Sequence, residues 1–223
     1  MSPVSSRKRP MRIGGASGGF SDRVFAITQL AKNPDVDVIM GDWLSEMTMT
    51  MHGQGKVNNQ KKAAAAGKGE NNLGVTGTGH HAAWNVHDSV KNAMFAENFI
   101  DCFRPAIPYL AKNGQKLAVN AGASDTEVLA KYVKQMCEEA GYPMKVAWVE
   151  GDDVTEAVEK LIKKGEKFES LMHGKALAEL GLDPVCAQAY VGGLGIAEAL
   201  RQGADIVICG RVADAAPAIG AAA

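Results

Sequence analysis

The sequence lacks any long hydrophobic run, any pair of closely spaced cysteines and any excess of charge of one sign. No stretch approaches the roughly 20 apolar residues of a membrane-spanning helix, so we expect no membrane partner. The 24 basic and 25 acidic side chains nearly cancel, which removes the electrostatic argument for binding nucleic acid. The four cysteines contain no CxxC pair and predict neither a disulfide framework nor a zinc site. These absences together favour a cytoplasmic protein.

The two ends of the chain differ in composition from the rest. Residues 1–10 contain three consecutive basic residues without a following apolar segment, which predicts a disordered basic tail rather than a secretory signal. Residues 215–223 are rich in alanine, and the chain stops inside an expected helix without a cap at its end. We therefore expect the domain at 11–223 to be truncated at its C-terminus.

Short apolar runs alternate with amphipathic segments along the chain, which is typical of an α/β fold. The runs are continuous rather than alternating in polarity, as expected for a mostly parallel sheet covered by helices on both faces. The predicted architecture is Rossmann-like and incomplete at the C-terminus. Five strands are expected, at residues 11–13, 35–40, 116–119, 144–149 and 205–209.

Helix signals lie between these strands. The strongest covers 124–140, where Ser124 and Glu127 match a capping box and apolar residues recur at helical spacing. A second amphipathic helix is expected at 154–162. Weaker signals cover residues 21–31 (with Ser21 as the cap and Val24 on the buried face), 89–112 and 192–202.

Two segments interrupt the alternation. Residues 51–88 are rich in Gly, Ala, Asn and Lys, which can contribute little to a core, so they predict a flexible insertion. Residues 165–187 are weakly periodic and predict a long, partly helical connection.

Small or polar residues follow every predicted strand. Ligands of open parallel sheets bind beyond the carboxyl ends of the strands, so we expect these residues to meet at one edge. They comprise Gly14, Gly15, Ser17, Gly18 and Gly19, then Gly41 and Asp42, Asn120 to Gly122, Glu150 to Asp153, and Gly210 with Arg211.

The glycine-rich stretch has two interpretations. Its N–H groups and the following helix N-terminus could bind an anion, or the glycines could only form a tight turn. The stretch matches neither GxGxxG nor the Walker sequence. Ser17 could contact a phosphate or act as a nucleophile.

The charged residues also allow alternatives. Asp152 and Asp153 could hold a metal or act as acid and base. Asp153 also begins a pattern typical of a helix cap, so Glu150 and Asp152 are the better candidates for the site. Arg211 could bind an anionic group while Asp214 orients it, or the two could form a surface ion pair. The histidines at 80, 81 and 87 fall in or beside the insertion and predict no metal site.

Taken together, the strand-end motifs resemble the N-terminal domain of the acyclic terpene utilisation (AtuA-type) family. The order and approximate spacing of the motifs fit along most of residues 11–223. The matching stretches are IGGASGGFSDR at 13–23, DWLSEMT at 42–48, VNAG at 119–122, VEGDD at 149–153, AYVG at 189–192 and GADIVICGRVAD at 203–214.

The resemblance implies a role in the catabolism of branched, terpenoid acids, whose intermediates are carried as CoA thioesters. The resemblance identifies positions that match the motifs of the family, but it identifies no proven catalytic residue. It leaves the reaction and any cofactor unknown. The positions are Ser17, Asp22, Glu46, Asn120, Glu150, Asp152, Tyr190, Arg211 and Asp214.

Three hypotheses follow. The first is an enzyme acting on a small anionic or acyl-thioester ligand, with Arg211 and the glycine N–H groups on the anion, Glu150 or Asp152 as base and Asn120 orienting. The second is a binding scaffold that holds the ligand for a partner enzyme. The third is a truncated product without independent activity, which a second copy or a missing C-terminal region would complete.

Overall fold

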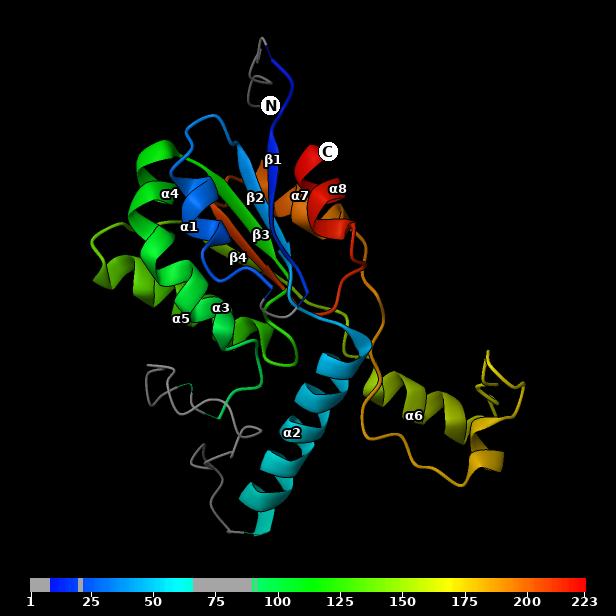
Figure 1. The fold of residues 1–223 in the computed structure, drawn as a ribbon. Helices are drawn as coiled ribbons and strands as arrows, with labels where there is room; N and C mark the ends of the chain where they lie inside the picture. Colours follow the sequence, from blue (N-terminus) through cyan, green and yellow to red (C-terminus); the bar gives the residue numbers. More distant parts are fainter. Residues whose placement is uncertain (1–8, 20–21, 66–89, 91) are drawn as a thin grey trace.

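Five parallel strands form one sheet at the centre of this computed structural model, which describes residues 9–19, 22–65, 90 and 92–223. The order across the sheet is β1-β2-β3-β5-β4 (Figure 1). The all-parallel sheet with helices around it confirms the predicted Rossmann-like class. The strands are β1 (Ile13–Gly18), β2 (Val38–Asp42), β3 (Lys116–Val119), β4 (Val146–Val149) and β5 (Ile206–Cys209).

Helices cover both faces of the sheet. One face carries α1 (Ala26–Ala31), α3 (Asn98–Phe103), α4 (Ile107–Asn113) and α5 (Thr126–Glu139), and the other carries α7 (Leu194–Arg201) and α8 (Ala216–Ala222) (Figure 1). Two further helices, α2 (Glu46–Ala65) and α6 (Thr155–Lys163), extend away from the carboxyl edge of the sheet (Figure 1). Short 3-10 turns occupy Arg104–Ala106 and Leu177–Leu180. No helix in the described part of the chain has the length and apolarity that crossing a membrane requires.

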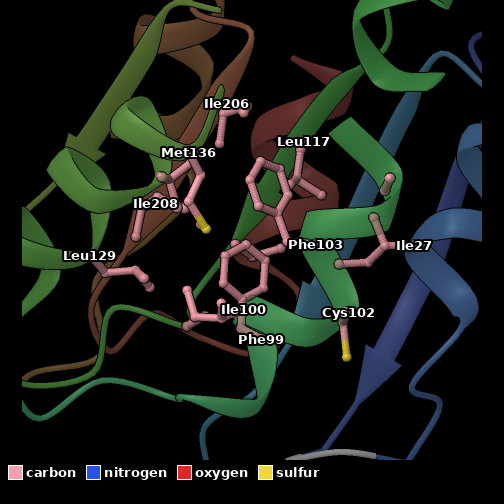
Figure 2. Close-up of a cluster of buried hydrophobic side chains, with 14 of the residues drawn as sticks. Ile27, Phe99, Ile100, Cys102, Phe103, Leu117, Leu129, Met136, Ile206 and Ile208 are labelled. Atoms are coloured by element: carbon pink, nitrogen blue, oxygen red, sulfur yellow. The ribbon is translucent and has the colours of Figure 1, made fainter. Parts of the chain in front are cut away.

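The larger core fills the space between the sheet and the four-helix face. Phe99 and Phe103 of α3 stack with ring centroids 5.4 Å apart, and Trp43 meets Phe99 edge-on at 5.3 Å. Figure 2 shows the α3 aromatic rings between side chains of α5 and of the central strands. A smaller core on the opposite face joins Ile196 of α7 to β5.

The glycine-rich stretch is a strand rather than the expected turn. β1 pairs with β2 from Ile13 to Gly18, and the register shifts between Gly15 and Ser17. The strand packs closely against α1 here, because a Cβ on Gly14 would lie 2.8 Å from a terminal methyl group of Leu30, which would have to shift. The sequence pattern placed this strand at residues 11–13 and missed its extension over the glycines, because glycine has no side chain to reveal a buried face.

Two helix starts also differ from prediction. Helix α1 begins at Ala26, which leaves Val24 exposed, while its expected cap, Ser21, lies outside the described residues. Helix α5 begins after Asp125 without a side-chain cap. Glu127, instead of completing the capping box, pairs with Lys131 one turn along the helix.

Part of the segment expected to be a flexible insertion is helical, since α2 runs from residue 46 to residue 65. Its glycines allow close approach to the rest of the chain, because a Cβ on Gly53 would overlap the Cys186 sulfur and one on Gly55 would overlap Met94. Lys56 further holds α2 by pairing with Asp125 at 3.2 Å. The remainder of the insertion at 66–88 and the basic tail at 1–8 lie outside the described residues.

Candidate functional site

At the carboxyl ends of β3 and β5, the connections lead to opposite faces of the sheet. The connection after β3 leads to α5 on one face, and the connection after β5 leads to α8 on the other. Open α/β sheets bind ligands in the crevice between two such neighbouring strands. Asn120 directly follows β3 and is fully buried, and Arg211 follows β5 with 2% of its surface exposed.

Asn120 ties the end of β3 to the end of β2. Its side-chain nitrogen donates to Asp42 Oδ1 at 2.5 Å, and its oxygen accepts from the Trp43 N–H at 2.6 Å. Ser17 Oγ lies 2.9 Å from the Asp42 carbonyl oxygen and 3.0 Å from Asp22 Oδ1, and its single proton can serve one of them at a time. The side chain of Asn120 is therefore engaged in holding β2 against β3.

The N–H groups predicted to bind an anion already have partners within β1 and the turn after it. Gly18 N donates to Asp22 Oδ2 at 3.2 Å, and Gly19 N donates to Ser17 Oγ at 3.3 Å. Gly15 contributes its carbonyl, which accepts from Arg23 Nη2 at 2.7 Å. An anion at Gly18 or Gly19 would have to displace Asp22 or Ser17, so anion binding by this segment stays a prediction.

Arg211 is the buried cation of the site. Its guanidinium lies 4.0 Å over the Tyr190 ring, donates from Nη2 to Asp214 at 2.8 Å, and donates from Nη1 to the Val212 carbonyl at 2.6 Å. Nε is buried and has no acceptor in the described part of the chain. Burial tends to lower the pKa of Arg211, but Asp214, Tyr190 and the charge of Asp42 raise it overall.

Tyr190 and Glu46 close the solvent side of this cluster. The Tyr190 hydroxyl donates to Glu46 Oε1, which joins two residues 144 positions apart in the chain. That hydrogen bond, followed by the backbone N–H of Glu46 itself, lowers the pKa of the carboxyl group, and the charge of Arg211 acts in the same direction. The pair therefore presents an ionised carboxylate beside the Tyr190 ring.

The two predicted general bases have different surroundings. Asp152 is buried and accepts a hydrogen bond from the Arg211 backbone N–H at 2.7 Å, and desolvation raises its pKa. Gly210 makes this approach possible, because a Cβ there would lie 2.5 Å from both carboxylate oxygens. Glu150 is exposed and makes no hydrogen bond with the described members of the cluster.

Asp42 was expected at the carboxyl edge of the sheet but was given no catalytic or binding role, and it lies between Asn120 and Ser17. Its Oδ1 accepts from both Asn120 and the Leu44 N–H, and its charge raises the pKa of Arg211. Its position at the end of β2 was the available signal. Within the described ranges, no three His, Cys, Asp or Glu side chains gather as metal ligands would; the histidines at 80, 81 and 87 fall outside those ranges.

A separate polar cavity of about 460 Å³ lies between α2 and the start of α6. Lys56, Ser124 and Thr155 are among the residues that line it, and of the strand-end residues named above only Asp153 does. The strand-end cluster and this cavity are therefore distinct.

The strand-end cluster combines a buried guanidinium with the hydroxyl groups of Ser17 and Tyr190, a set that can hydrogen-bond a carboxylate or a thioester carbonyl. Neither the curated proteins nor the solved structures contain a match to this sequence. Residues 11–223 match the family described as "Acyclic terpene utilisation family protein AtuA". This match spans every strand of the sheet and every residue of the cluster, and the chain therefore belongs to the acyclic terpene utilisation family.

Proposed function

We propose that this terpene-utilisation protein binds the carboxylate or thioester end of a branched, terpenoid acid at the carboxyl ends of β3 and β5. The observation that carries the proposal is the Arg211 guanidinium, which is buried while its Nε lacks an acceptor in the described residues. Buried polar groups are almost always hydrogen-bonded. A ligand oxygen would supply the missing acceptor.

The surroundings of Arg211 support an acyl ligand. The Tyr190 ring on one side of the guanidinium fixes its plane, and Asp214 fixes its direction. A positively charged donor held in this way stabilises negative charge that develops on a carbonyl oxygen during acyl chemistry. In a catalytic version of the proposal, Arg211 therefore polarises the carbonyl, and Asp152 or Glu150 removes a proton.

A scaffold that binds without chemistry is the second candidate. It is favoured by the hydrogen bond from the Arg211 N–H to Asp152, since this occupies the buried carboxylate that would otherwise act as base. Turnover of a bound CoA thioester decides between the two. Release of free CoA, or any change in the acyl group, supports an enzyme, whereas saturable binding with unchanged ligand supports the scaffold.

The proposal is tested by calorimetric titration of the protein with a terpenoid acid such as citronellate and with the matched alcohol. Since a hydrogen bond to a charged group contributes about 1.5–3 kcal/mol, the acid should bind at least about tenfold more tightly. Arg211→Lys keeps the charge and removes the Nε donor, so it should weaken acid binding by a similar factor. Arg201→Lys, on the exposed surface of α7, is the matched control.

Thermal melts of both variants establish that they are folded before they are compared. Equal affinity for acid and alcohol, or an Arg211→Lys variant that binds the acid like the unchanged protein, would show that the carboxylate is not bound by Arg211.

A further inference from the structure

The guanidinium of Arg211 is closed off from solvent in the conformation that the structure shows. Its Nε atom is buried without an acceptor in the described residues, and the whole residue is 2% exposed. A ligand oxygen that accepts a hydrogen bond from Nε therefore cannot reach it until a covering group moves. The conformation described here is thus a closed one.

The Tyr190 ring is the covering group that can move by itself. The guanidinium contacts the Asp214 carboxylate, the Val212 carbonyl and the Tyr190 ring. Asp214 and Val212 lie within three residues of Arg211 and belong to the same loop. Tyr190 comes from a different segment, contacts the guanidinium on one side and is 50% exposed. Its ring therefore separates the guanidinium from solvent.

The backbone on either side of Tyr190 is held in place. The Ala189 N–H donates to the Asp152 carbonyl at 2.7 Å, and the Val191 N–H donates to the Arg211 carbonyl at 3.3 Å. Opening therefore needs no movement of the segment, only rotation of the Tyr190 side chain about its Cα–Cβ bond. Because the backbone stays fixed, the ring returns to the same position when it closes.

Two interactions hold the ring in the closed position. One is its contact with the guanidinium, and the other is the hydrogen bond from its hydroxyl group to Glu46. Glu46 is the first residue of α2, which Lys56 holds to the rest of the chain by its ion pair with Asp125. A hydrogen bond between two exposed side chains contributes little net free energy, so this one can break and re-form at equilibrium.

We propose that Tyr190 is a gate over Arg211 and that Glu46 holds the gate closed. Rotation of the Tyr190 side chain breaks its hydrogen bond to Glu46 and opens a path to Nε of Arg211 for the acyl ligand. Glu46 is a positioning residue, because it acts through Tyr190. The identity of the ligand rests on the proposed function, whereas the gate rests on the geometry around Arg211 alone.

Modification of arginine side chains by phenylglyoxal, followed by mass spectrometry of the peptides, tests the gate without any ligand. Arg201 is the reference in every sample, because its side chain is 57% exposed. In the unchanged protein, Arg211 should react at least about tenfold more slowly than Arg201. Tyr190→Phe keeps the ring and removes the hydrogen bond, so it should accelerate the reaction of Arg211 by about threefold to tenfold.

Variants of Glu46 separate its hydrogen bond from its charge. Glu46→Ala removes the bond and should accelerate the reaction of Arg211 as Tyr190→Phe does, and the double variant should be no faster than either single one. Glu46→Gln removes the charge but keeps an oxygen acceptor, so it should stay closer to the unchanged protein.

Tyr142→Phe is the matched control for the loss of a hydroxyl group. Tyr142 is a similarly exposed tyrosine (41%) that precedes β4, at the opposite edge of the sheet. This variant should leave the reaction of Arg211 unchanged. Thermal melts of all variants establish that they are folded before their reactions are compared.

The gate is rejected if Arg211 of the unchanged protein reacts as fast as Arg201, or if Tyr190→Phe behaves like Tyr142→Phe. Additive effects in the double variant, or a Glu46→Gln variant as fast as Glu46→Ala, would show that Glu46 does not act through its hydrogen bond to Tyr190.

These outcomes are independent of those for the proposed function. A protein that shows the gate but binds acid and alcohol equally would keep the gate and reject the proposed function. Acid binding that depends on Arg211, together with a reaction of Arg211 that is insensitive to Tyr190→Phe, would do the reverse.

Discussion

Helices α5 and α6 follow β3 and β4, which are consecutive in the chain, and show the same kind of amphipathic pattern, but they differ in what covers them. α5 buries Leu129, Val133 and Met136 against the sheet and α3. α6 has a comparable apolar stripe and no buried residue. The pattern in the sequence thus predicts that a helix has an apolar face, whereas the position of the helix relative to the sheet decides whether the same chain buries that face.

The largest effect that tests this contrast is expected from truncation of one leucine on each helix. Leu129→Ala removes a fully buried side chain and should lower the free energy of unfolding by about 2–5 kcal/mol. Leu161→Ala, at a residue that is 42% exposed, should cost less than about 1 kcal/mol. Urea denaturation of both variants measures the two losses. Equal losses would contradict the contrast.

A smaller loss of stability is expected from a substitution at Gly210, which lies next to the site. Gly210→Ala should push Asp152 away from the Arg211 N–H and lower the free energy of unfolding by about 1–3 kcal/mol. Gly192→Ala, in the segment that leads into α7, has open space around the added methyl group and should stay within about 0.5 kcal/mol of the unchanged protein. If the two variants have the same free energy of unfolding in urea, the position of Asp152 does not exclude a side chain at position 210.

The smallest effect is expected from charge and depends on pH. Burial of Asp205 acts to raise its pKa, but Lys116 at 2.7 Å and the Lys145 N–H outweigh it and lower the pKa overall. The unfolded chain then binds the proton more tightly, so the stabilisation is present above the unfolded pKa of about 3.9 and is lost as pH falls through the lower folded value.

Asp205→Asn should therefore be less stable than the unchanged protein at neutral pH, and the difference should shrink as acid is added. Urea midpoints between neutral and strongly acidic pH measure this. Glu127→Gln disrupts an exposed ion pair with Lys131 and should change little at any pH. A constant difference between Asp205→Asn and the unchanged protein across this range would mean that ionisation of Asp205 does not stabilise the fold.

Most of the fold follows from local patterns in the sequence. The strand at 116–119 has the predicted bounds, and the apolar run at 205–209 is β5 from 206 to 209. These segments could be predicted because both of their faces are buried, which makes them continuously apolar. The first strand was predicted at 11–13, but the bounds of β1 at Ile13–Gly18 could not be, because its glycines carry no such pattern.

For the site, the sequence predicted only which residues lie at the carboxyl ends of the strands. Asn120 and Arg211 were expected at the carboxyl edge because each follows a strand. The bond between Asn120 and Asp42 depends on the register of β2 against β3, where Gly41 pairs with Val119. The contact between Glu46 and Tyr190 depends on how α2 leaves the sheet. Neither of these long-range relations is encoded in local periodicity.

The strand order has a consequence for how the chain folds. β5 pairs with both β3 and β4, whereas the described part of β4 pairs with β5 alone. β5, which lies between β3 and β4, is thus synthesised after both of its neighbours, and β4 has no strand to pair with until residue 206 has emerged. Contacts between distant segments slow folding because a long loop must first close. During synthesis the aromatic side chains of α3 accordingly stay incompletely covered until β5 inserts, and chaperone binding at this stage would protect them from aggregation.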